Sequence, residues 1–325
     1  MSEWNQASLQ ALARSFQESR IFLTGAELGL FDLVATQPLS AEAIAARIGA
    51  NVHGLTILLD ALSAMGLLVK DGSVYRCDPS AAPFLQAEGP TSVLASVLHT
   101  ADLWHRWTQL TALVAGEQAR LPSSAAYQRA FIGAMHVGAA GQADPIVALV
   151  KPGLARKLLD VGGASGTYTV AFLRANPTMK ASLFDRPAVV DMARERLAAA
   201  GMLDRVTLVA GDFYRDALPP GHDLAFVSAI IHQNSPQQNV DLFRKVLASL
   251  DPGGRIVVRD YVLSPDRTSP RSGAIFAVNM LSAGREGNCY TYAEIKEALE
   301  QAGFTGVKLA HVGQQMDSLV EASKP

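Results

Sequence analysis

Three segments of the chain combine glycine and acidic residues in a way that suits a nucleoside ligand. Each follows a short apolar run that predicts a β-strand: LDVGGASGT at 159–167, Asp185, and Gly-Asp-Phe at 211–213. Glycines let a backbone turn tightly and approach a ligand closely. A carboxylate at the second strand end can accept both ribose hydroxyls. At the third, a carboxylate can take an exocyclic amine and an aromatic ring can stack on a purine. The three together predict a nucleoside site.

Two common alternatives fit the glycine-rich segment poorly. The dinucleotide fingerprint G-x-G-x-x-G fails because Ala164 and Thr167 stand at its second and third glycine positions counted from Gly162. The nucleophile elbow G-x-S-x-G fails because Thr167 stands where its last glycine belongs.

The elements that carry these residues alternate between strand and helix from about residue 154 onward. Amphipathic helical patterns separate the short β-type runs, which argues for a parallel, doubly wound α/β sheet of Rossmann-like type. Ligands of such sheets bind beyond the carboxyl ends of the strands, near the switch point. The predicted strands are 157–161, 181–184, 206–210, 224–227, 255–258 and 307–310, and the predicted helices are 169–175, 188–200, 239–250 and 292–302.

The N-terminal third has the outline of a winged helix. Helical periodicity covers 5–35, a second helix follows Ser40, a third is expected at 55–65, and Asp71-Gly72 marks a hairpin. A DNA reader would need basic side chains on its second helix. Residues 55–66 contain no Lys or Arg, so we expect a packing or dimerisation module and no nucleic-acid partner.

Residues 91–150 are expected to be helical and contain clustered aromatic residues. Trp104 lies in one group, and Phe131 and Met135 lie in a second. The spacing of Phe131 and Met135 puts both on one helix face. Two interpretations remain open: these side chains belong to the core, or they form the walls of an apolar acceptor pocket.

Composition restricts the class of protein. The chain has 325 residues, 49% of them hydrophobic, and a formal net charge of -2, which argues for about two folded domains and against a surface for phosphate backbones or anionic lipid. Two cysteines make no disulfide framework, and the scattered histidines offer no metal motif. A polar start and the lack of a long apolar run lead us to expect a cytoplasmic protein.

Taken together, these segments resemble the class I O-methyltransferases of the plant caffeate and bacterial polyketide or phenazine type. The resemblance covers nearly the whole chain, and the glycine loop and the Gly-Asp-Phe segment are its specific parts. Its motifs are LLDVGGASGTYT at 158–169, FDRP at 184–187, AGDFY at 210–214, IIHQN at 230–234, LDPGGRIVVRDYVL at 250–263 and YTYAEIKEALEQAGF at 290–304.

The resemblance implies S-adenosylmethionine as methyl donor, a small acceptor with a phenolic or enolic hydroxyl, and a homodimer. It implies a dimerisation domain at 1–95, a helical acceptor-pocket segment at 96–145 and a donor-binding domain at 146–325. Gly162 and Gly166 would underlie the methionine part, Asp185 would hold the ribose, and Asp212 with Phe213 the adenine. The full set expected to bind the donor is Asp160, Gly162, Gly163, Gly166, Asp185, Arg186, Gly211, Asp212, Phe213 and Ser228.

The resemblance also places a catalytic base at His232, just past the fourth predicted strand. A neutral imidazole can take a proton from an acceptor hydroxyl as the methyl group is attacked. Asp260, at the end of the fifth strand, matches an acidic position that would fix the imidazole tautomer. Asn279 and Met280 match positions that touch the acceptor or belong to the core.

The sequence departs from the family pattern near that base. Gln233 and Asn234 stand where the family has an aspartate and a tryptophan, and Cys289 stands at a second acidic position, where we expect a small buried residue. A methyltransferase acting on carbon, nitrogen or sulfur, or a relative that uses the donor site for other chemistry, therefore stays open. The winged-helix outline leaves a second alternative, a ligand-responsive DNA-binding regulator, which the uncharged residues 55–66 disfavour.

Overall fold

A computed structural model describes residues 4–87, 89, 91–117, 133, 135, 138–139, 141–283 and 287–325. Contacts divide the chain into two compact units, Met1–His105 with Ser124–Val137, and Arg106–Ser123 with Gly138–Pro325. We describe each unit by itself. No helix among the described residues is long and apolar enough to cross a membrane.

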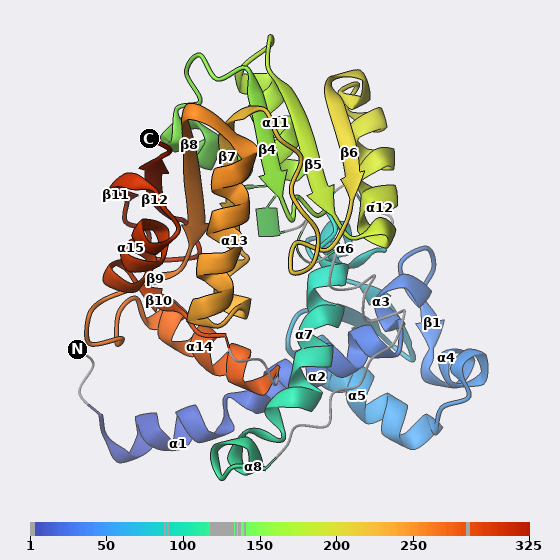
Figure 1. The fold of residues 1–325 in the computed structure, drawn as a ribbon. Coiled ribbons are helices and arrows are strands. Elements are labelled where there is room, and N and C mark those ends of the chain that lie inside the picture. Colours follow the sequence, from blue (N-terminus) through green and yellow to red (C-terminus); the bar gives the residue numbers. More distant parts are fainter. Residues whose placement is uncertain are drawn as a thin grey trace. The chain divides into compact units, whose positions relative to one another are not determined.

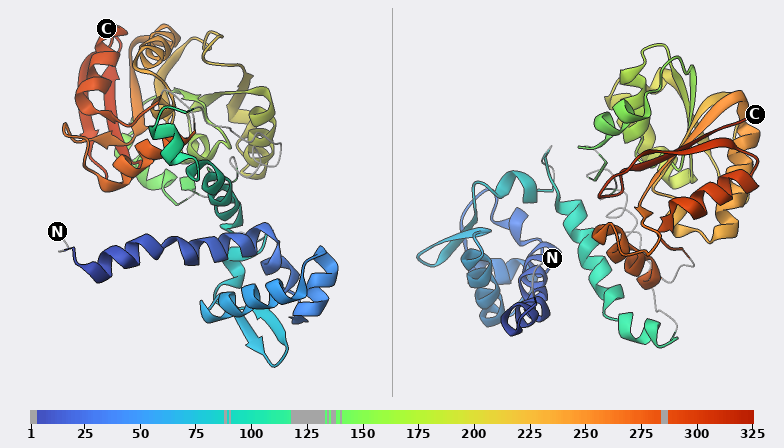
Figure 2. Two further views of the ribbon diagram at one scale, coloured as in Figure 1. Left: turned by 90° about the horizontal axis from the view of Figure 1, so that it is seen from below. Right: turned by 90° about the vertical axis from the view of Figure 1, so that its left-hand side faces the viewer.

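The first unit begins with three helices where the sequence pattern indicated one continuous segment. They are α1 (Gln6–Arg14), α2 (Phe16–Glu27) and α3 (Leu30–Leu33). The first break is at Ser15, whose hydroxyl donates to the carbonyl of Leu12, and the second is at Gly29, whose φ of +64° leaves the helical region. Figure 2 shows α1 extending away from the rest of this unit, and no residue of α1 is buried.

The winged-helix outline is present in this unit. Ser40 caps α4 (Ala41–Ile48), and Asn51 caps α5 (Val52–Ala64), which starts earlier than expected because the Asn51 side chain accepts from the Gly54 amide. The hairpin of β2 (Leu68–Asp71) and β3 (Val74–Cys77) turns at the expected place, and β1 (Leu39–Ser40) pairs with β3. α6 (Ala82–Leu85) and α7 (Leu94–Trp107) follow.

The second unit is built on a seven-stranded sheet in the order β11-β12-β8-β7-β4-β5-β6. The five strands from β8 to β6 are parallel, and β11 and β12 join antiparallel at one edge. This confirms the predicted α/β class. The strands are β4 (Lys157–Val161), β5 (Lys180–Asp185), β6 (Val206–Ala210), β7 (His222–Ser228), β8 (Leu250–Asp260), β11 (Thr305–His311) and β12 (Ser318–Ser323).

Helices cover both faces of this sheet (Figure 1). On one face α10 (Ala143–Val150), α11 (Thr167–Ala175) and α12 (Pro187–Ala199) pack against alternate strand residues such as Leu183 and Phe226. On the other, α13 (Pro236–Ser249) and α15 (Tyr292–Gln301) pack against residues such as Val227 and Val258. The short helix α8 (Leu110–Val114) and α14 (Arg271–Ser282) complete the unit, with β9 (Val262–Leu263) pairing parallel to β10 (Tyr290–Thr291).

β4 has β5, the next strand of the sheet in sequence, as its neighbour on one side and β7 as its neighbour on the other. The strand order therefore reverses at β4, and the carboxyl ends of β4, β5, β6 and β7 meet along one edge of the sheet. Residues just past these strand ends are placed to share one ligand.

Candidate active site

The turn from β4 into α11 has no room for a side chain at its first two residues, Gly162 and Gly163. Gly162 has a φ of +65°, and a Cβ at this position would lie 2.4 Å from Cδ1 of Ile230. A Cβ on Gly163 would lie 2.7 Å from Cγ of Leu183. Gly166, with a φ of +75°, begins α11. The turn therefore exposes backbone at the sheet edge, where a ligand can approach closely.

Asp185 ends β5 beside this turn. One carboxylate oxygen accepts from the amide of Ala164 at 2.9 Å and the other from the amide of Arg186 at 2.7 Å. Each oxygen keeps a further lone pair for a ligand hydroxyl. Burial raises the pKa of this carboxyl above its ordinary value. The Arg186 side chain itself is exposed.

The segment after β6 brings Gly211, Asp212 and Phe213 to the same edge. The Gly211 amide donates to the Asp185 carbonyl at 2.9 Å, and a Cβ on Gly211 would lie 2.5 Å from Cζ of Phe184. Asp212 accepts from the amide of Tyr214 at 3.0 Å. A Cβ on Gly162 would come 3.9 Å from Cε1 of Phe213. The structure thus brings all three predicted segments together.

Asp160 lies beneath the turn, with its side chain 2% exposed. Its carboxylate accepts a hydrogen bond from Thr169 in the first turn of α11, at 2.5 Å. Burial raises the pKa of Asp160 to about 6. This carboxyl therefore anchors the start of α11 to the end of β4 from below.

His232 and Asp260 lie against each other at the ends of β7 and β8. His232 belongs to the 3-10 turn η2 (Ile231–Gln233), and both residues are buried. The Nδ1 atom of His232 lies 2.9 Å from each carboxylate oxygen of Asp260. A carboxylate only accepts, so Nδ1 carries the hydrogen, and in the neutral imidazole Nε2 then presents its lone pair. Among the described residues, Nε2 has no hydrogen-bond partner.

Phe276 of α14 packs edge-on against the His232 ring, with centroids 4.9 Å apart. The sequence reasoning missed this contact. The sequence holds one signal for this contact: Phe276 lies three residues before the predicted site residue Asn279, on the same face of the helix.

Asn234 is the centre of a buried hydrogen-bond network that holds the His232 segment. Its side-chain oxygen accepts from the Tyr214 hydroxyl at 2.6 Å, and its amide donates to Asn239 at 3.0 Å. Asn239 in turn donates to the Ile231 carbonyl at 3.1 Å, and the Tyr290 hydroxyl donates to the Asn234 carbonyl. The hydrogen bonds of Asn234 thus explain why an asparagine occupies this position, and the sequence alone did not indicate them.

Cys289 is fully buried beside Asp260, in a cluster with Tyr261, Leu263 and Phe276. Burial, with the Asp260 charge as the second cause, raises the pKa of the Cys289 thiol to about 12. This thiol is therefore neutral and a poor nucleophile at physiological pH.

The residues predicted to touch the acceptor fall into different parts of the chain. Asn279 accepts from Nε1 of Trp107 at 3.1 Å, and Met280 is buried, both within the second unit. Trp104 belongs to the first unit, where it packs near Phe16 with ring centroids 6.1 Å apart. Met135 also belongs to the first unit and is 38% exposed, whereas Phe131 lies outside the described residues.

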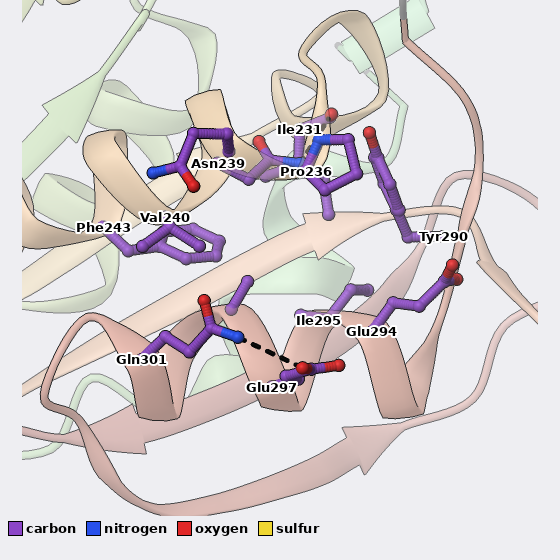
Figure 3. A pocket seen from close by; sticks show the side chains of 12 residues that line it. Ile231, Pro236, Asn239, Val240, Phe243, Tyr290, Glu294, Ile295, Glu297 and Gln301 are labelled. Carbon is purple, nitrogen blue, oxygen red and sulfur yellow. Dashed lines mark hydrogen bonds between the residues drawn. The ribbon is translucent and has the colours of Figure 1, made fainter.

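A separate hollow of about 240 Å³ lies between α13 and α15 (Figure 3). Its walls include Ile231, Tyr290 and the side chain of Gln301, which donates to Glu297. None of the residues that we predicted for the site lines this hollow. In the described part of the chain, no group of three or more His, Cys, Asp or Glu residues is placed to hold a metal ion.

Comparison with known proteins identifies the family. The O-methyltransferase domain model matches residues 121–305, and the O-methyltransferase dimerisation domain model matches residues 10–87. The chain belongs to the O-methyltransferase family. It is an S-adenosylmethionine-dependent O-methyltransferase, as the sequence motifs predicted.

Relatives match along nearly the full length. The tetracenomycin polyketide synthesis 8-O-methyltransferase of Streptomyces glaucescens is 31% identical over 97% of this chain and 95% of its own. The 3-hydroxy-5-methyl-1-naphthoate 3-O-methyltransferase of Streptomyces sahachiroi is 30% identical over 92% of this chain and 90% of its own. The crystal structure of human N-acetylserotonin methyltransferase in complex with S-adenosylmethionine has a TM-score of 0.81 at 25% identity and covers 100% of this chain and 99% of its own.

Proposed function

We propose that this methyltransferase acts on a hydroxyl of a small aromatic or enolic acceptor, with His232 as general base and Asp260 as the residue that orients it. The observation that carries the proposal is the pairing of His232 Nδ1 with the Asp260 carboxylate at 2.9 Å. This pairing leaves Nε2 as a proton acceptor just past the end of β7, next to the strand ends of the donor site.

The residues at the sheet edge fit the donor. Ile230 and Phe184 pack so closely on Gly162 and Gly211 that neither position can carry a Cβ, so bare backbone is kept at this edge. Asp185 would hold the ribose, Asp212 and Phe213 the adenine, and Gly162, Gly163 and Gly166 would underlie the methionine part. When bound, S-adenosylmethionine supplies the electrophilic methyl group.

The chain's own contribution to the reaction is proton transfer and positioning. His232 Nε2 would take the hydroxyl proton when the acceptor oxygen displaces S-adenosylhomocysteine from the methyl group, and the Asp260 carboxylate would balance the charge of the imidazolium. Base assistance of this kind is typically worth roughly 10²–10⁴ in rate. Phe276 restricts the His232 ring from one side, so the ring keeps one orientation.

The acceptor class rests on the relatives and on the residues near the base. One relative is named for an 8-O-methylation in tetracenomycin polyketide synthesis and another for the 3-hydroxyl of a naphthoate. We propose that Asn279 and Met280 of the second unit contact the acceptor; the expectation for Trp104, Phe131 and Met135 stays a prediction from the sequence. The pair of Asn279 and Trp107 places an amide and an indole together in the second unit.

We also propose a homodimer formed through the dimerisation domain at 1–95, with 96–145 as the acceptor-pocket segment and 146–325 as the donor-binding domain. Exposed apolar side chains at the N-terminal end support the dimer. Leu9 and Leu12 of α1 lie three residues apart, on one helix face, and each is 53% exposed in the single chain; Phe16, the first residue of α2, is 50% exposed.

Product analysis tests the proposed reaction. The wild-type chain is incubated with S-adenosylmethionine and separate panels of phenols, thiols and amines, and methylated products are identified by mass spectrometry. We expect O-methyl products from a phenol or enol, and turnover at least 100-fold lower in His232→Ala. Near-normal O-methylation by that variant would contradict the role of His232 as base.

Methylation of another atom is the second candidate. Gln233, Asn234 and Cys289 replace residues that flank the base in the family, and an amine or thiol acceptor needs less help from a base. Products from only the amine or thiol panel, with unchanged turnover in His232→Ala, would select this candidate.

A further inference from the structure

Arg259 is a buried cation without an acidic partner among the described residues. It occupies β8 immediately before Asp260, and its side chain is 6% exposed. On the same strand and face, Arg255 pairs with Glu321 at 2.9 Å. A buried guanidinium that lacks a counter-charge is unfavourable, and such groups normally pair with a carboxylate or phosphate.

The contacts that Arg259 makes with described residues are all with neutral groups. One terminal nitrogen donates to the Ser228 hydroxyl at 3.1 Å and the other to the Gln142 side-chain oxygen at 3.1 Å. The guanidinium carbon lies 5.1 Å from the centre of the Tyr168 ring. Its Nε and the Tyr168 hydroxyl are buried, and neither has a hydrogen-bond partner among the described residues. The group therefore retains donors for an anion.

The position of Arg259 indicates which anion. Ser228 ends β7, the strand beside β4, and Tyr168 lies in the first turn of the helix that follows the glycine turn. In the strand order β8-β7-β4-β5-β6, Asp185 ends β5 and Asp212 follows β6, on one side of that turn, and Arg259 lies in β8 on the other. A donor whose adenosine binds the acids extends its amino-acid end toward β7 and β8.

We propose that Arg259 binds the carboxylate of the methionine part of S-adenosylmethionine, with Ser228 and Gln142 orienting the guanidinium. This inference rests on the donor site proposed above. A charge-assisted pair of this kind is among the stronger hydrogen-bonded contacts in proteins. The pair would give the buried cation its counter-charge only when the donor is bound.

Calorimetry with two ligands tests this role. S-adenosylhomocysteine carries the carboxylate, and 5′-methylthioadenosine lacks the whole amino-acid end. We expect Arg259→Met to weaken S-adenosylhomocysteine binding by about 10- to 100-fold and 5′-methylthioadenosine binding by less than about twofold. Arg259→Lys, which keeps the charge, should recover part of the loss. Arg255→Met is the matched control and should change neither affinity.

An equal loss of affinity for both ligands in Arg259→Met, or no loss of affinity for either, would overturn the assignment. If Arg259→Met does not fold, the wild type and Arg259→Lys are compared with decarboxylated S-adenosylhomocysteine, which keeps the amine. The wild type should then bind the decarboxylated ligand at least about tenfold more weakly than S-adenosylhomocysteine, and the difference should be smaller for Arg259→Lys. Equal affinities of the wild type for both ligands would contradict the proposal. A wild-type chain that binds neither adenosyl ligand would instead overturn the donor site, and the role of Arg259 with it.

Discussion

Nδ1 of His232 lies 2.9 Å from both carboxylate oxygens of Asp260, and both side chains are buried. The pairing joins the segment after β7 to the end of β8. It holds one imidazole nitrogen as a donor and leaves the other as an acceptor. The consequences of this pair, and of the strand ends beside it, can each be measured.

Loss of the imidazole should affect turnover and spare donor binding. We expect His232→Ala to lower kcat by roughly 10²–10⁴ because the hydroxyl proton then has no positioned acceptor. S-adenosylhomocysteine affinity, measured by calorimetry, should stay the same. The matched control is His222→Gln, which replaces a buried histidine that hydrogen-bonds to Ser182, away from the site. Equal loss of turnover in both variants would refute a specific role for His232.

Asp260→Asn should reduce turnover with little change in size. A carboxamide can donate to Nδ1, which moves the hydrogen to Nε2 and removes the acceptor that the hydroxyl needs. The kcat of Asp260→Asn should therefore fall toward that of His232→Ala, and the double variant should be no slower than the slower single variant. Additive losses in the double variant would mean that the two residues act independently.

The glycine turn should tolerate no side chain. Ala at Gly162 would bring a Cβ to 2.4 Å from Ile230, in addition to the strain of its φ of +65°. We expect roughly tenfold weaker S-adenosylhomocysteine binding, or worse. Gly201 has a φ of +66° with nothing within 4 Å, so Gly201→Ala carries the strain alone. Equal affinities in the two variants would show that the close approach at Gly162 is unimportant.

Two buried groups should give the stability opposite pH-dependences. The pKa of Asp160 is raised to about 6, so the folded state holds a proton that the unfolded state has lost, and the free energy of unfolding falls as pH rises from about 4 to 6. Burial lowers the pKa of His222 to about 4, so between about pH 6.5 and 4 the unfolded state binds a proton that the folded state does not. The free energy of unfolding therefore falls as pH falls from about 6.5 to 4.

Variants separate the two contributions. Relative to the wild type, Asp160→Asn should gain stability as pH rises from 4 to 6, and His222→Gln should gain stability as pH falls over the same range. Each change should be on the order of 1–3 kcal/mol, since one pKa unit corresponds to about 1.4 kcal/mol. Urea unfolding at a series of pH values measures both. The same sign of change in the two variants would contradict these pKa directions.

The apolar face of α1 should hold the dimer together. Leu12→Asp places a charge on a residue that is 53% exposed in the single chain, so we expect it to yield monomers in analytical ultracentrifugation. Leu154→Asp is the control, because Leu154 is 97% exposed and lies in the other unit. A wild-type monomer, or a Leu12→Asp dimer of unchanged affinity, would contradict the proposal.

Sequence reasoning was most successful where local pattern decides the structure. The strand-helix alternation predicted the parallel part of the sheet, and the residues at three strand ends meet at one edge. It missed β12, which lies between β11 and β8 and pairs antiparallel with both. Residues 318–323 show neither a turn signal beside them nor a pattern that indicates which strand they pair with. It also joined α1, α2 and α3, since Ser15 and Gly29 are tolerated inside helical patterns.

Contacts between distant segments were beyond its reach. In the sequence Asn234 is only a departure from a motif. In the structure it forms hydrogen bonds with Tyr214, Asn239 and Tyr290, which come from three other segments. In the sequence Arg259 only follows the predicted strand 255–258, and nothing local shows that the described part of the chain places no acidic side chain against it. Such relations depend on which side chains tertiary packing brings together, and only the folded chain contains that information.

The most direct test of the account is calorimetric titration with S-adenosylhomocysteine of the wild-type chain and of Asp185→Asn. The account predicts one ligand bound per chain in the wild type, and affinity at least about tenfold lower in the variant, because ribose hydroxyls would lose a charged acceptor. No heat with the wild type at millimolar ligand, with heat from a nicotinamide dinucleotide or a nucleoside triphosphate instead, would contradict it.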